Sequence, residues 1–355
     1  MAGTGSPLDA DEVRDRVEKT LDSFVSQQTT VLLQIGEEMA PAASAISELL
    51  RGGKRLRPAF AYWGWRGAGG GDTEAILQAA TALELLQACA LIHDDVMDDS
   101  DTRRGQPSVH RRFEMLHRDA QWHGSPQAFG IGSAILAGDL CLSWADELLF
   151  ASPFPADALM RAKPVFDLMR TELMAGQYLD LLEQARGGGS QERALRVARY
   201  KSAKYTVERP LHLGAALAGA PPELMAAYSA YGIPLGEAFQ LRDDILGVFG
   251  DPEETGKPAG DDLREGKRTV LVAVAWERAG PAQASVIRRH LGDPHLGSEG
   301  VAALREVVHD TGALARVEEL VTTLTDTALR ALASVPEPAR DTLHRLALAA
   351  TRRRQ

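Results

Sequence analysis

The sequence predicts an all-α protein, a bundle of about ten or more helices. Three observations support this fold class: alanine and leucine dominate the long segments, the alternating β-branched pattern of strands is scarce, and the breaks fall at Gly or Pro clusters. Length alone would favour two or more domains. Because no repeat and no linker-like change of composition interrupts the 355 residues, we expect one helical domain over residues 1–355.

The expected helices are separated by short segments rich in glycine and proline. The chain is expected to begin with a capped amphipathic helix in "SPLDADEVRDRVEKTLDSFV" (6–25). The later breaks are "RGGKRLRP" (51–58), "RGAGGGD" (66–72), "WHGSP" (122–126), "ASPFP" (151–155), "ARGGGSQ" (185–191), "GAPP" (219–222) and "GDPEETGKPAGDD" (250–262). The terminal "TRRRQ" is expected to be a solvated tail.

Composition excludes several classes of protein. A formal net charge of -10 argues against a nucleic-acid surface and suits a protein that works with bound cations. The two cysteines form neither a disulfide framework nor a metal cluster, which indicates a reducing compartment. The N-terminus lacks the pattern of a signal peptide, so a cytoplasmic protein is expected. The most apolar stretch, Ala75–His93, contains Glu84 and two glutamines, so it is predicted to be a buried core helix and not a membrane span.

The segment "LIHDDVMDDSDTRRG" (91–105) crowds five aspartates into eight positions and then places two arginines side by side. So many carboxylates repel one another unless water, cations or arginines neutralise them. The segment ends the helix predicted over Thr73–Asp98, which is apolar nearly all round and should lie in the middle of the bundle. The aspartates therefore form either a solvated helix end or a metal site.

Spacing favours a magnesium site. Asp94 and Asp98 are four residues apart, so they lie one turn apart on one helix face, whereas Asp95 points about 100° away. One or two carboxylates per ion is typical of Mg²⁺, which keeps water and phosphate oxygens as its other ligands. An EF-hand calcium loop does not fit, because no Glu stands at the twelfth position of a loop starting at Asp95 or Asp99.

A second acidic helix end strengthens the metal interpretation. The segment "LGEAFQLRDDILGVFGD" (235–251) again closes an apolar helix with paired aspartates, Asp243 and Asp244. A single such pair is as readily a solvated helix end as a metal site. Two pairs on separate buried helices favour a common function in metal binding.

Basic residues accompany both acidic groups. "GGKRLRP" (52–58) places Lys54, Arg55 and Arg57 after two glycines as a compact cationic site, and planar arginines can bind phosphate through two bonds. Arg103 and Arg104 follow the first acidic group, and "YKSAK" (200–204) and "TGKPAGDDLREGKR" (255–268) add further cations. The simplest ligand for this arrangement is a pair of diphosphates, one held by metal and one by basic side chains alone.

These motifs, with "LAGD" (136–139) and "AGQYLDL" (175–181), resemble in their order the trans-type polyprenyl diphosphate synthases. The similarity covers roughly residues 40 to 270 and is closest to bacterial geranylgeranyl diphosphate synthases. It implies the isoprenoid synthase fold, a helical bundle around a central cavity, and a homodimer. It also implies that an allylic diphosphate (dimethylallyl, geranyl or farnesyl) ionises, that isopentenyl diphosphate attacks the cation, and that three Mg²⁺ ions stabilise the departing diphosphate.

The resemblance assigns roles to individual residues. Asp94, Asp98 and Asp243 resemble the metal ligands, supported by Asp95 and Asp244, and Lys201 joins them among the catalytic residues. The expected isopentenyl diphosphate site consists of Lys54, Arg57, Gln87 and Arg104. The expected contacts of the allylic diphosphate are Arg103, Lys201, Ser202, Gln240, Lys257 and Lys267. Gln177 and Asp180 resemble polar groups on the metal side of the cavity.

One position departs from the family pattern. The second motif usually reads DDxxD, but its third position here is Gly247, so one carboxylate near the third metal is missing. Either Asp243 binds with waters alone or Asp251 reaches in from the following loop. That loop, "GDPEETGKPAGDDLREGKR" (250–268), is expected to fold over bound diphosphate and to be mobile without it.

The resemblance also predicts product length. Cys89 and Ala90, five and four residues before Asp94, are small, whereas aromatic residues at these positions stop growth at short products in the family. Leu86 lies two turns, roughly 11 Å, below Asp94 and is the next expected floor. Geranylgeranyl diphosphate is therefore the expected product.

Two alternatives remain open. A terpene cyclase of the same fold would ionise an allylic diphosphate but would not need the cations Lys54, Arg57 and Arg104. A non-catalytic modulatory subunit of another synthase would be expected to lose an aspartate group, yet Asp94, Asp95 and Asp98 are intact.

Overall fold

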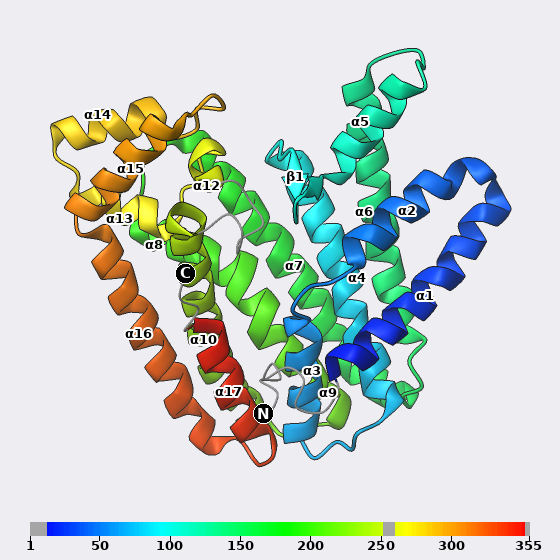
Figure 1. Ribbon diagram of the computed structural model, residues 1–355. Helices are drawn as coiled ribbons and strands as arrows, with labels where there is room; N and C mark the ends of the chain where they lie inside the picture. The colour runs from blue at the N-terminus through cyan, green and yellow to red at the C-terminus, as the bar shows by residue number, and fades with distance from the viewer. Residues whose placement is uncertain (1–12, 251–259, 352–355) are drawn as a thin grey trace, which may run out of the picture. The chain divides into compact units, whose positions relative to one another are not determined.

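The computed structural model describes residues 13–250 and 260–351, and helices account for nearly all regular structure within these ranges (Figure 1). The predicted all-α fold class is confirmed. The chain divides into two compact units: unit 1 comprises Met1–Tyr62 and Gly71–Leu159, and unit 2 comprises Trp63–Gly70 and Met160–Gln355. The single domain over residues 1–355 stays a prediction.

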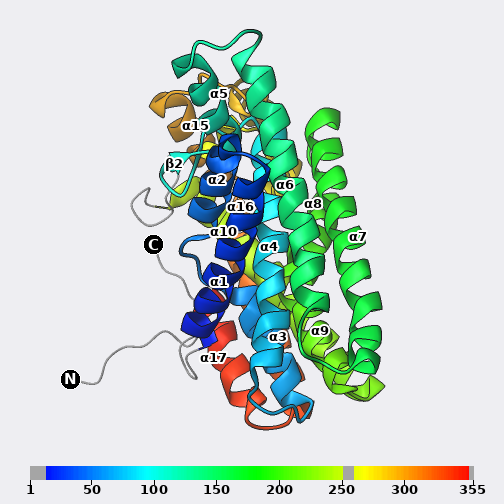
Figure 2. The same ribbon diagram turned by 90° about the vertical axis from the view of Figure 1, so that its right-hand side faces the viewer.

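Unit 1 is built around helix α4. The helix is apolar on every side, and Ile76, Leu83, Leu86 and Ile92 are all at most 1% exposed, so its predicted central position is confirmed. Helices α1, α2, α5 and α6 pack against it, and Figures 1 and 2 both show α6 alongside α4. The elements are α1 (Val13–Ile35), the 3₁₀ turn Glu37–Met39, α2 (Ala40–Leu50), the start of α3 (Leu56–Gly67), α4 (Glu74–Met97), β1 (Thr102–Arg103), β2 (Gln106–Pro107), α5 (Val109–Asp119) and α6 (Pro126–Phe150).

Unit 2 is built around helix α10, which packs against α16, α17 and a π-helix (Figure 1). Its elements are most of α7 (Ala156–Arg186), α8 (Gln191–Val197), the π-helix Ala198–Glu208, α9 (Arg209–Ala218), α10 (Pro222–Phe249), α12 (Asp261–Arg264), α13 (Val270–Arg278), α14 (Pro281–His290), α15 (Ser298–Asp310), α16 (Ala313–Ala331), the 3₁₀ turn Leu332–Ser334 and α17 (Ala339–Thr351). The π-helix was not predicted from the sequence.

The predicted breaks match the observed helix ends, and local chemistry explains several of them. Ser125 accepts a hydrogen bond from the Ala128 amide, and Pro126 occupies the first position of α6, which together start that helix. Gly219 adopts φ 71° directly after α9, a conformation that glycine takes without strain. The predicted N-terminal cap, the middle of the break at 250–262 and the last four residues of the tail lie outside the described residues.

Two described helices, α4 and α6, are long and apolar enough to cross a membrane by length and composition alone. In α4, 72% of the most apolar window is buried inside the protein, which agrees with the predicted core helix. Cys89 and Cys141 are buried free thiols.

Candidate active site

The first acidic group lies at the C-terminal end of α4 in unit 1. Asp98 ends the helix in helical conformation, and its amide donates to the Asp94 carbonyl at 2.8 Å. The two aspartates therefore keep the one-turn register that was predicted from their spacing. Both side chains are half-buried.

Arginines hold the other aspartates of this segment. Asp95 is 1% exposed and accepts bonds from Arg103, with Nε at 3.0 Å from Oδ1. Arg111 of α5 donates to Asp99 at 2.9 Å and to Asp101 at 2.8 Å. These three carboxylates are thus compensated within the protein itself. Arg103, the first of the two adjacent arginines, therefore also orients the aspartate motif that precedes it, because it binds Asp95.

The second paired arginine reaches the cationic turn. Arg104 and Gly105 have φ values of 54° and 73°, which close the β1–β2 hairpin through a two-residue turn. The Arg104 Nη1 donates to the carbonyls of Leu49 at 3.0 Å and Arg51 at 2.9 Å, at the end of α2. Burial, and then the charge of Arg55, lower the pKa of Arg104. The hairpin is therefore tied to the segment that carries Lys54 and Arg57.

The predicted compact cationic site in "GGKRLRP" needs one correction. Arg55 points inward: it is 4% exposed, and its guanidinium donates to Glu84 at 2.5 Å and to the Leu50 carbonyl at 2.6 Å. The guanidinium of Arg55 is therefore engaged in a buried ion pair. Lys54 is exposed and Arg57 is half-buried, so these two remain the ligand candidates of the turn.

Gln87 lies on α4, two turns before Asp94. Its side-chain Oε1 is buried and makes no hydrogen bond within the described part of the chain. A buried amide without a partner is unfavourable, so this side chain has unused capacity to bind a polar ligand. Because Oε1 accepts hydrogen bonds and a diphosphate oxygen also only accepts them, the role of Gln87 in a diphosphate site stays a prediction.

The second acidic group lies at the C-terminal end of α10 in unit 2. Asp244 is 4% exposed and accepts a hydrogen bond from Gln240 Nε2 at 2.8 Å. Burial, together with the charges of Asp262 and Asp243, raises the pKa of Asp244 to about 7, although the hydrogen bond from Gln240 acts in the opposite direction. Asp243 is half-buried. Asp243 is accordingly the better candidate for a metal ligand, with Asp244 behind it.

The predicted allylic residues Lys201 and Ser202 lie on the π-helix. Lys201 Nζ contacts Asp180 Oδ2 of α7 at 2.7 Å, which brings together two residues that the sequence analysis had assigned separately. The two helices meet at Gly176, where a Cβ atom would lie 2.4 Å from the Lys201 backbone nitrogen. Gln177 therefore stands beside the same contact. π-Helices are often found at functional sites.

A network of partly buried charges, not identified from the sequence, links α7 to Lys204 of the π-helix and to Arg209, the first residue of α9. Glu172 of α7 accepts bonds from Lys204 at 2.7 Å and from Arg209 at 2.6 and 2.9 Å. These pairs involve residues that are more than thirty positions apart, and no sequence spacing indicates them.

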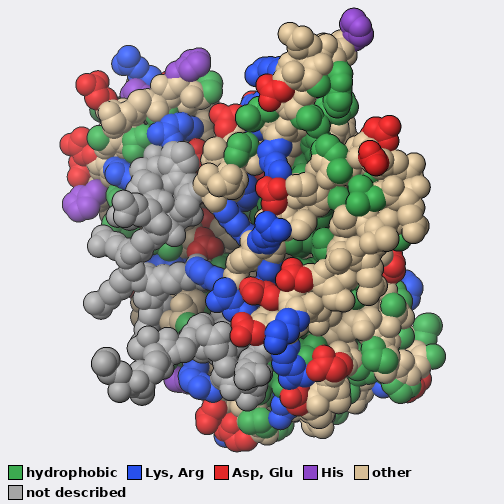
Figure 3. Space-filling view, turned by 45° about the vertical axis from the view of Figure 1, so that its right-hand side comes forward, with side chains coloured by type: hydrophobic (Ala, Val, Ile, Leu, Met, Phe, Trp, Pro, Cys, Tyr) green, Lys and Arg blue, Asp and Glu red, His purple; other side chains and the backbone are tan. Residues whose placement is uncertain are grey.

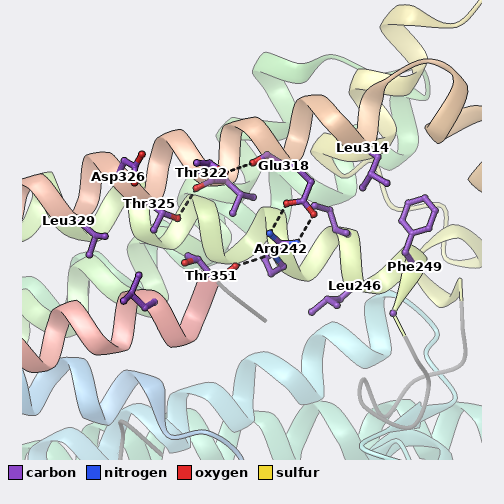
Figure 4. A pocket seen from close by; sticks show the side chains of 14 residues that line it. Arg242, Leu246, Phe249, Leu314, Glu318, Thr322, Thr325, Asp326, Leu329 and Thr351 are labelled. Atoms are coloured by element: carbon purple, nitrogen blue, oxygen red, sulfur yellow. Dashed lines mark hydrogen bonds and ion pairs between the residues drawn. The ribbon is translucent and has the colours of Figure 1, made fainter. Parts of the chain in front are cut away.

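A cavity of about 1020 Å³ lies in unit 2 along another face of α10 (Figure 4). In Figure 4, Arg242 projects toward α16 and α17, where it donates to both Glu318 oxygens at 2.7 Å and to the Thr351 carbonyl at 3.1 Å. Its charge is therefore compensated within unit 2. Arg242 precedes Asp243 directly, so this contact also holds the acidic end of α10.

The predicted chain-length residues differ in exposure. Cys89 and Leu86 are 4% and 1% exposed, and burial raises the pKa of the Cys89 thiol to about 12. Ala90 is only half-buried. Of the three, Ala90 is thus the residue with surface left for an apolar ligand.

The remaining predicted residues are placed as follows. Lys267 contacts Glu265 at 2.5 Å and Asp262 at 3.7 Å. Residues 251–259 of the predicted flap, which include Asp251 and Lys257, lie outside the described residues. Among residues 13–250 and 260–351, no three His, Cys, Asp or Glu side chains form a preformed metal cage. The donor set, one or two carboxylates at each helix end, fits Mg²⁺ that takes its other ligands from water and phosphate.

Comparison with known proteins gives the same family as the motifs. The polyprenyl synthetase family model matches residues 40–309. The geranylfarnesyl diphosphate synthase of Aeropyrum pernix is 32% identical over 80% of this chain and 84% of its own length, and the geranylgeranyl diphosphate synthase of Methanosarcina mazei is 34% identical over 76% of each.

Solved structures agree. A geranylgeranyl pyrophosphate synthase from Corynebacterium glutamicum, determined with isoprenyl diphosphate and magnesium, is 44% identical, has a TM-score of 0.94 and covers 98% of this chain and 100% of its own. The enzyme from Pyrococcus horikoshii has a TM-score of 0.78 at 28% identity, with 97% of this chain and 100% of its own covered. The chain therefore belongs to the polyprenyl synthetase family, the trans-prenyltransferases of the all-α isoprenoid synthase fold.

Proposed function

We propose that this chain is a Mg²⁺-dependent prenyl diphosphate synthase that condenses isopentenyl diphosphate with an allylic diphosphate, with geranylgeranyl diphosphate as the main product. The observation that carries the proposal is the pairing of Arg104 with the turn of Lys54 and Arg57. The same part of unit 1 is linked to α4, because Arg55 pairs with Glu84 and Arg103 with Asp95. A prenyl synthase needs a second diphosphate site without metal, and a cyclase does not.

In this proposal the two acidic groups bind metal, and the basic residues bind the two diphosphates. When bound, Mg²⁺ supplies the Lewis acid that stabilises charge on the departing diphosphate. Asp94, Asp98 and Asp243 would hold it, and Arg103 and Lys201 would contact the allylic diphosphate. Lys54, Arg57 and Arg104 would orient isopentenyl diphosphate so that its double bond attacks the allylic carbon. One C–O bond breaks with its electrons on the diphosphate, one C–C bond forms, and one proton is lost.

We further propose a homodimer and a cytoplasmic location. Helix α7 exposes a row of large apolar side chains, Met160, Leu168, Met174 and Tyr178, and α6 exposes Phe129, Ile135 and Leu136. Apolar rows of this size are typical of subunit interfaces, and a second copy of the chain is the simplest partner. Nucleic acid is not an expected partner, because Figure 3 shows basic and acidic side chains interspersed on the face in view and the net charge is negative.

The decisive experiment is chromatography of products from purified protein, Mg²⁺, isopentenyl diphosphate and each allylic primer in turn. Products that are longer than the primer by whole isoprene units are expected, with geranylgeranyl diphosphate dominant. Cyclic hydrocarbons formed without isopentenyl diphosphate would instead identify a cyclase. Absence of any turnover by protein that binds Mg²⁺ and diphosphate normally would favour a modulatory subunit.

A further inference from the structure

The space above Gly247 is occupied by a carboxylate from another segment. Residue 247 lies four positions after Asp243 and hence on the same face of α10, one turn further along. A Cβ atom built on Gly247 would lie 2.0 Å from Asp262 Oδ2 and 2.9 Å from its Cγ. A real Cβ does not approach other atoms that closely, so the carboxylate of Asp262 takes the place that a side chain at position 247 would fill.

Packing of the neighbouring residues fixes this position. Leu263 is 1% exposed and packs in the core of unit 2 with Leu241 and Ile245 of α10. Its carbonyl accepts a hydrogen bond from the Gly292 amide at 2.9 Å. The Asp262 carbonyl in turn accepts from the Lys267 amide at 3.0 Å. The backbone of Asp262 is therefore held on both sides, and its side chain is directed at α10.

The adjacent aspartate shows that this placement is specific. Asp261 is paired with Arg264 at 3.8 Å, within its own short helix. Asp262 has Lys267 Nζ at 3.7 Å, but that ammonium lies closer to Glu265, at 2.5 Å. The Asp262 charge is thus only weakly compensated, although it stands beside the paired aspartates of α10. Carboxylates this close favour a bound cation.

We propose that Asp262 supplies the carboxylate that the second motif lacks, and that it helps Asp243 to hold Mg²⁺ at the end of α10. This inference rests on the proposed function. A side chain at position 247 would force the carboxylate of Asp262 to move, whereas glycine leaves it in this place. A hard oxygen donor in this place suits Mg²⁺, either as a direct ligand or through a bound water.

The test measures the Mg²⁺ concentration needed for half-saturation of inorganic diphosphate binding, by titration calorimetry, and for half-maximal turnover. Asp262→Ala is expected to raise both by about 10-fold or more. The matched control Asp261→Ala, which removes a neighbouring carboxylate from the same helix, should behave like wild type. Circular dichroism and thermal melting establish that each variant is folded, and Asp262→Asn repeats the test with unchanged shape.

A reciprocal exchange makes the test sharper. Gly247→Asp alone should weaken Mg²⁺ binding, because two carboxylates then compete for one space. Gly247→Asp combined with Asp262→Ala returns a single carboxylate to that space and should recover most of the loss seen in Asp262→Ala. A double variant no better than Asp262→Ala, or Asp262→Ala and Asp262→Asn with wild-type Mg²⁺ requirement, overturns the inference. If Asp94→Ala and Asp243→Ala also leave the Mg²⁺ requirement unchanged, the proposed function fails as well.

Discussion

The arginines around the first motif separate its aspartates by function. Arg103 and Arg111 compensate the carboxylates that point away from the face of Asp94 and Asp98. Charge repulsion along the segment is thereby reduced without any metal, and the two aspartates one turn apart keep the geometry that suits a cation. Specific arginine partners therefore offset the electrostatic repulsion between the crowded carboxylates.

If these aspartates hold metal, Asp94→Ala or Asp243→Ala should lower turnover by about 100-fold or more, because stabilisation of the leaving diphosphate is lost. The fold should stay intact, since removal of one charge reduces repulsion in the metal-free protein. Steady-state kinetics and thermal melting measure the two effects. Wild-type activity should vanish with EDTA and return with Mg²⁺; full activity in both variants would contradict the metal site.

Asp244 predicts a pH dependence of stability in the metal-free protein. Its pKa is raised to about 7 in the folded state by burial, so the folded protein holds this proton more tightly than the unfolded chain. The resulting stability is present at low pH and is lost as pH rises toward and through 7. In EDTA, Asp244→Asn should gain stability relative to wild type between pH 5 and pH 8, as measured by urea unfolding at the two pH values. Equal stability of both proteins at both pH values would contradict the buried acid.

At the element scale, both acidic groups stand at ends of long buried helices, and other helices brace those ends. In unit 2, Arg242 ties the end of α10 to Glu318 of α16 and to the last carbonyl of α17. The π-helix is braced in the same way against α7, through Lys201 and Lys204 in its middle. Long helices thus present short polar ends whose positions depend on a few ion pairs.

Arg242→Met should lower the free energy of unfolding by about 1–3 kcal/mol, because it leaves Glu318 without its partner and removes the bond to Thr351. It should also raise the Mg²⁺ requirement, since Asp243 follows directly. Urea unfolding and Mg²⁺-dependent kinetics measure the two changes. Glu319→Gln is the control, because Glu319 pairs only with Arg316 in the described contacts and is 66% exposed; equal effects of both substitutions would contradict the bracing role.

Ala90→Phe tests the chain-length prediction, which depends on the geometry of α4. Ala90 lies one turn before Asp94 and keeps accessible surface, so a phenyl ring there should block the growing tail and shorten the product. If Ala90 were only a packing residue, the larger side chain would instead overpack the core and reduce stability. Product chromatography and thermal melting distinguish the two. A folded, active variant with unchanged product length would exclude Ala90 from the chain-length site.

At the scale of the whole molecule, exposed apolar surface predicts assembly. Met160, Leu168, Met174 and Tyr178 lie along α7, and each is 44 to 67% exposed. Several large apolar side chains exposed on one helix are unfavourable in water unless another chain covers them.

Leu168→Glu should convert a dimer into a monomer, because it buries an unpaired charge in the proposed interface. Size-exclusion chromatography with light scattering gives the mass directly. Thr323→Glu adds the same charge to an exposed position of α16 and should leave the mass unchanged. A wild-type protein that is monomeric at micromolar concentration would contradict the dimer.

The helical class, the helix breaks and the two acidic helix ends could be predicted from the sequence. Each of these features depends on residues that are close together in the sequence. Examples are the periodicity of α4, the caps and glycines between helices, and the spacing of Asp94 and Asp98. Order and spacing of such motifs also sufficed to indicate the family.

Which charged residues face each other could not be predicted from the sequence. Arg55 proved to be the partner of buried Glu84, the π-helix was set by contacts between α7 and residues 198–208, and Asp262 came to lie over Gly247. Each of these pairings joins residues that are at least 15 positions apart in the chain. These pairings are stabilised by the packing and burial of the core residues around them. Local sequence patterns do not show which distant residues pack together.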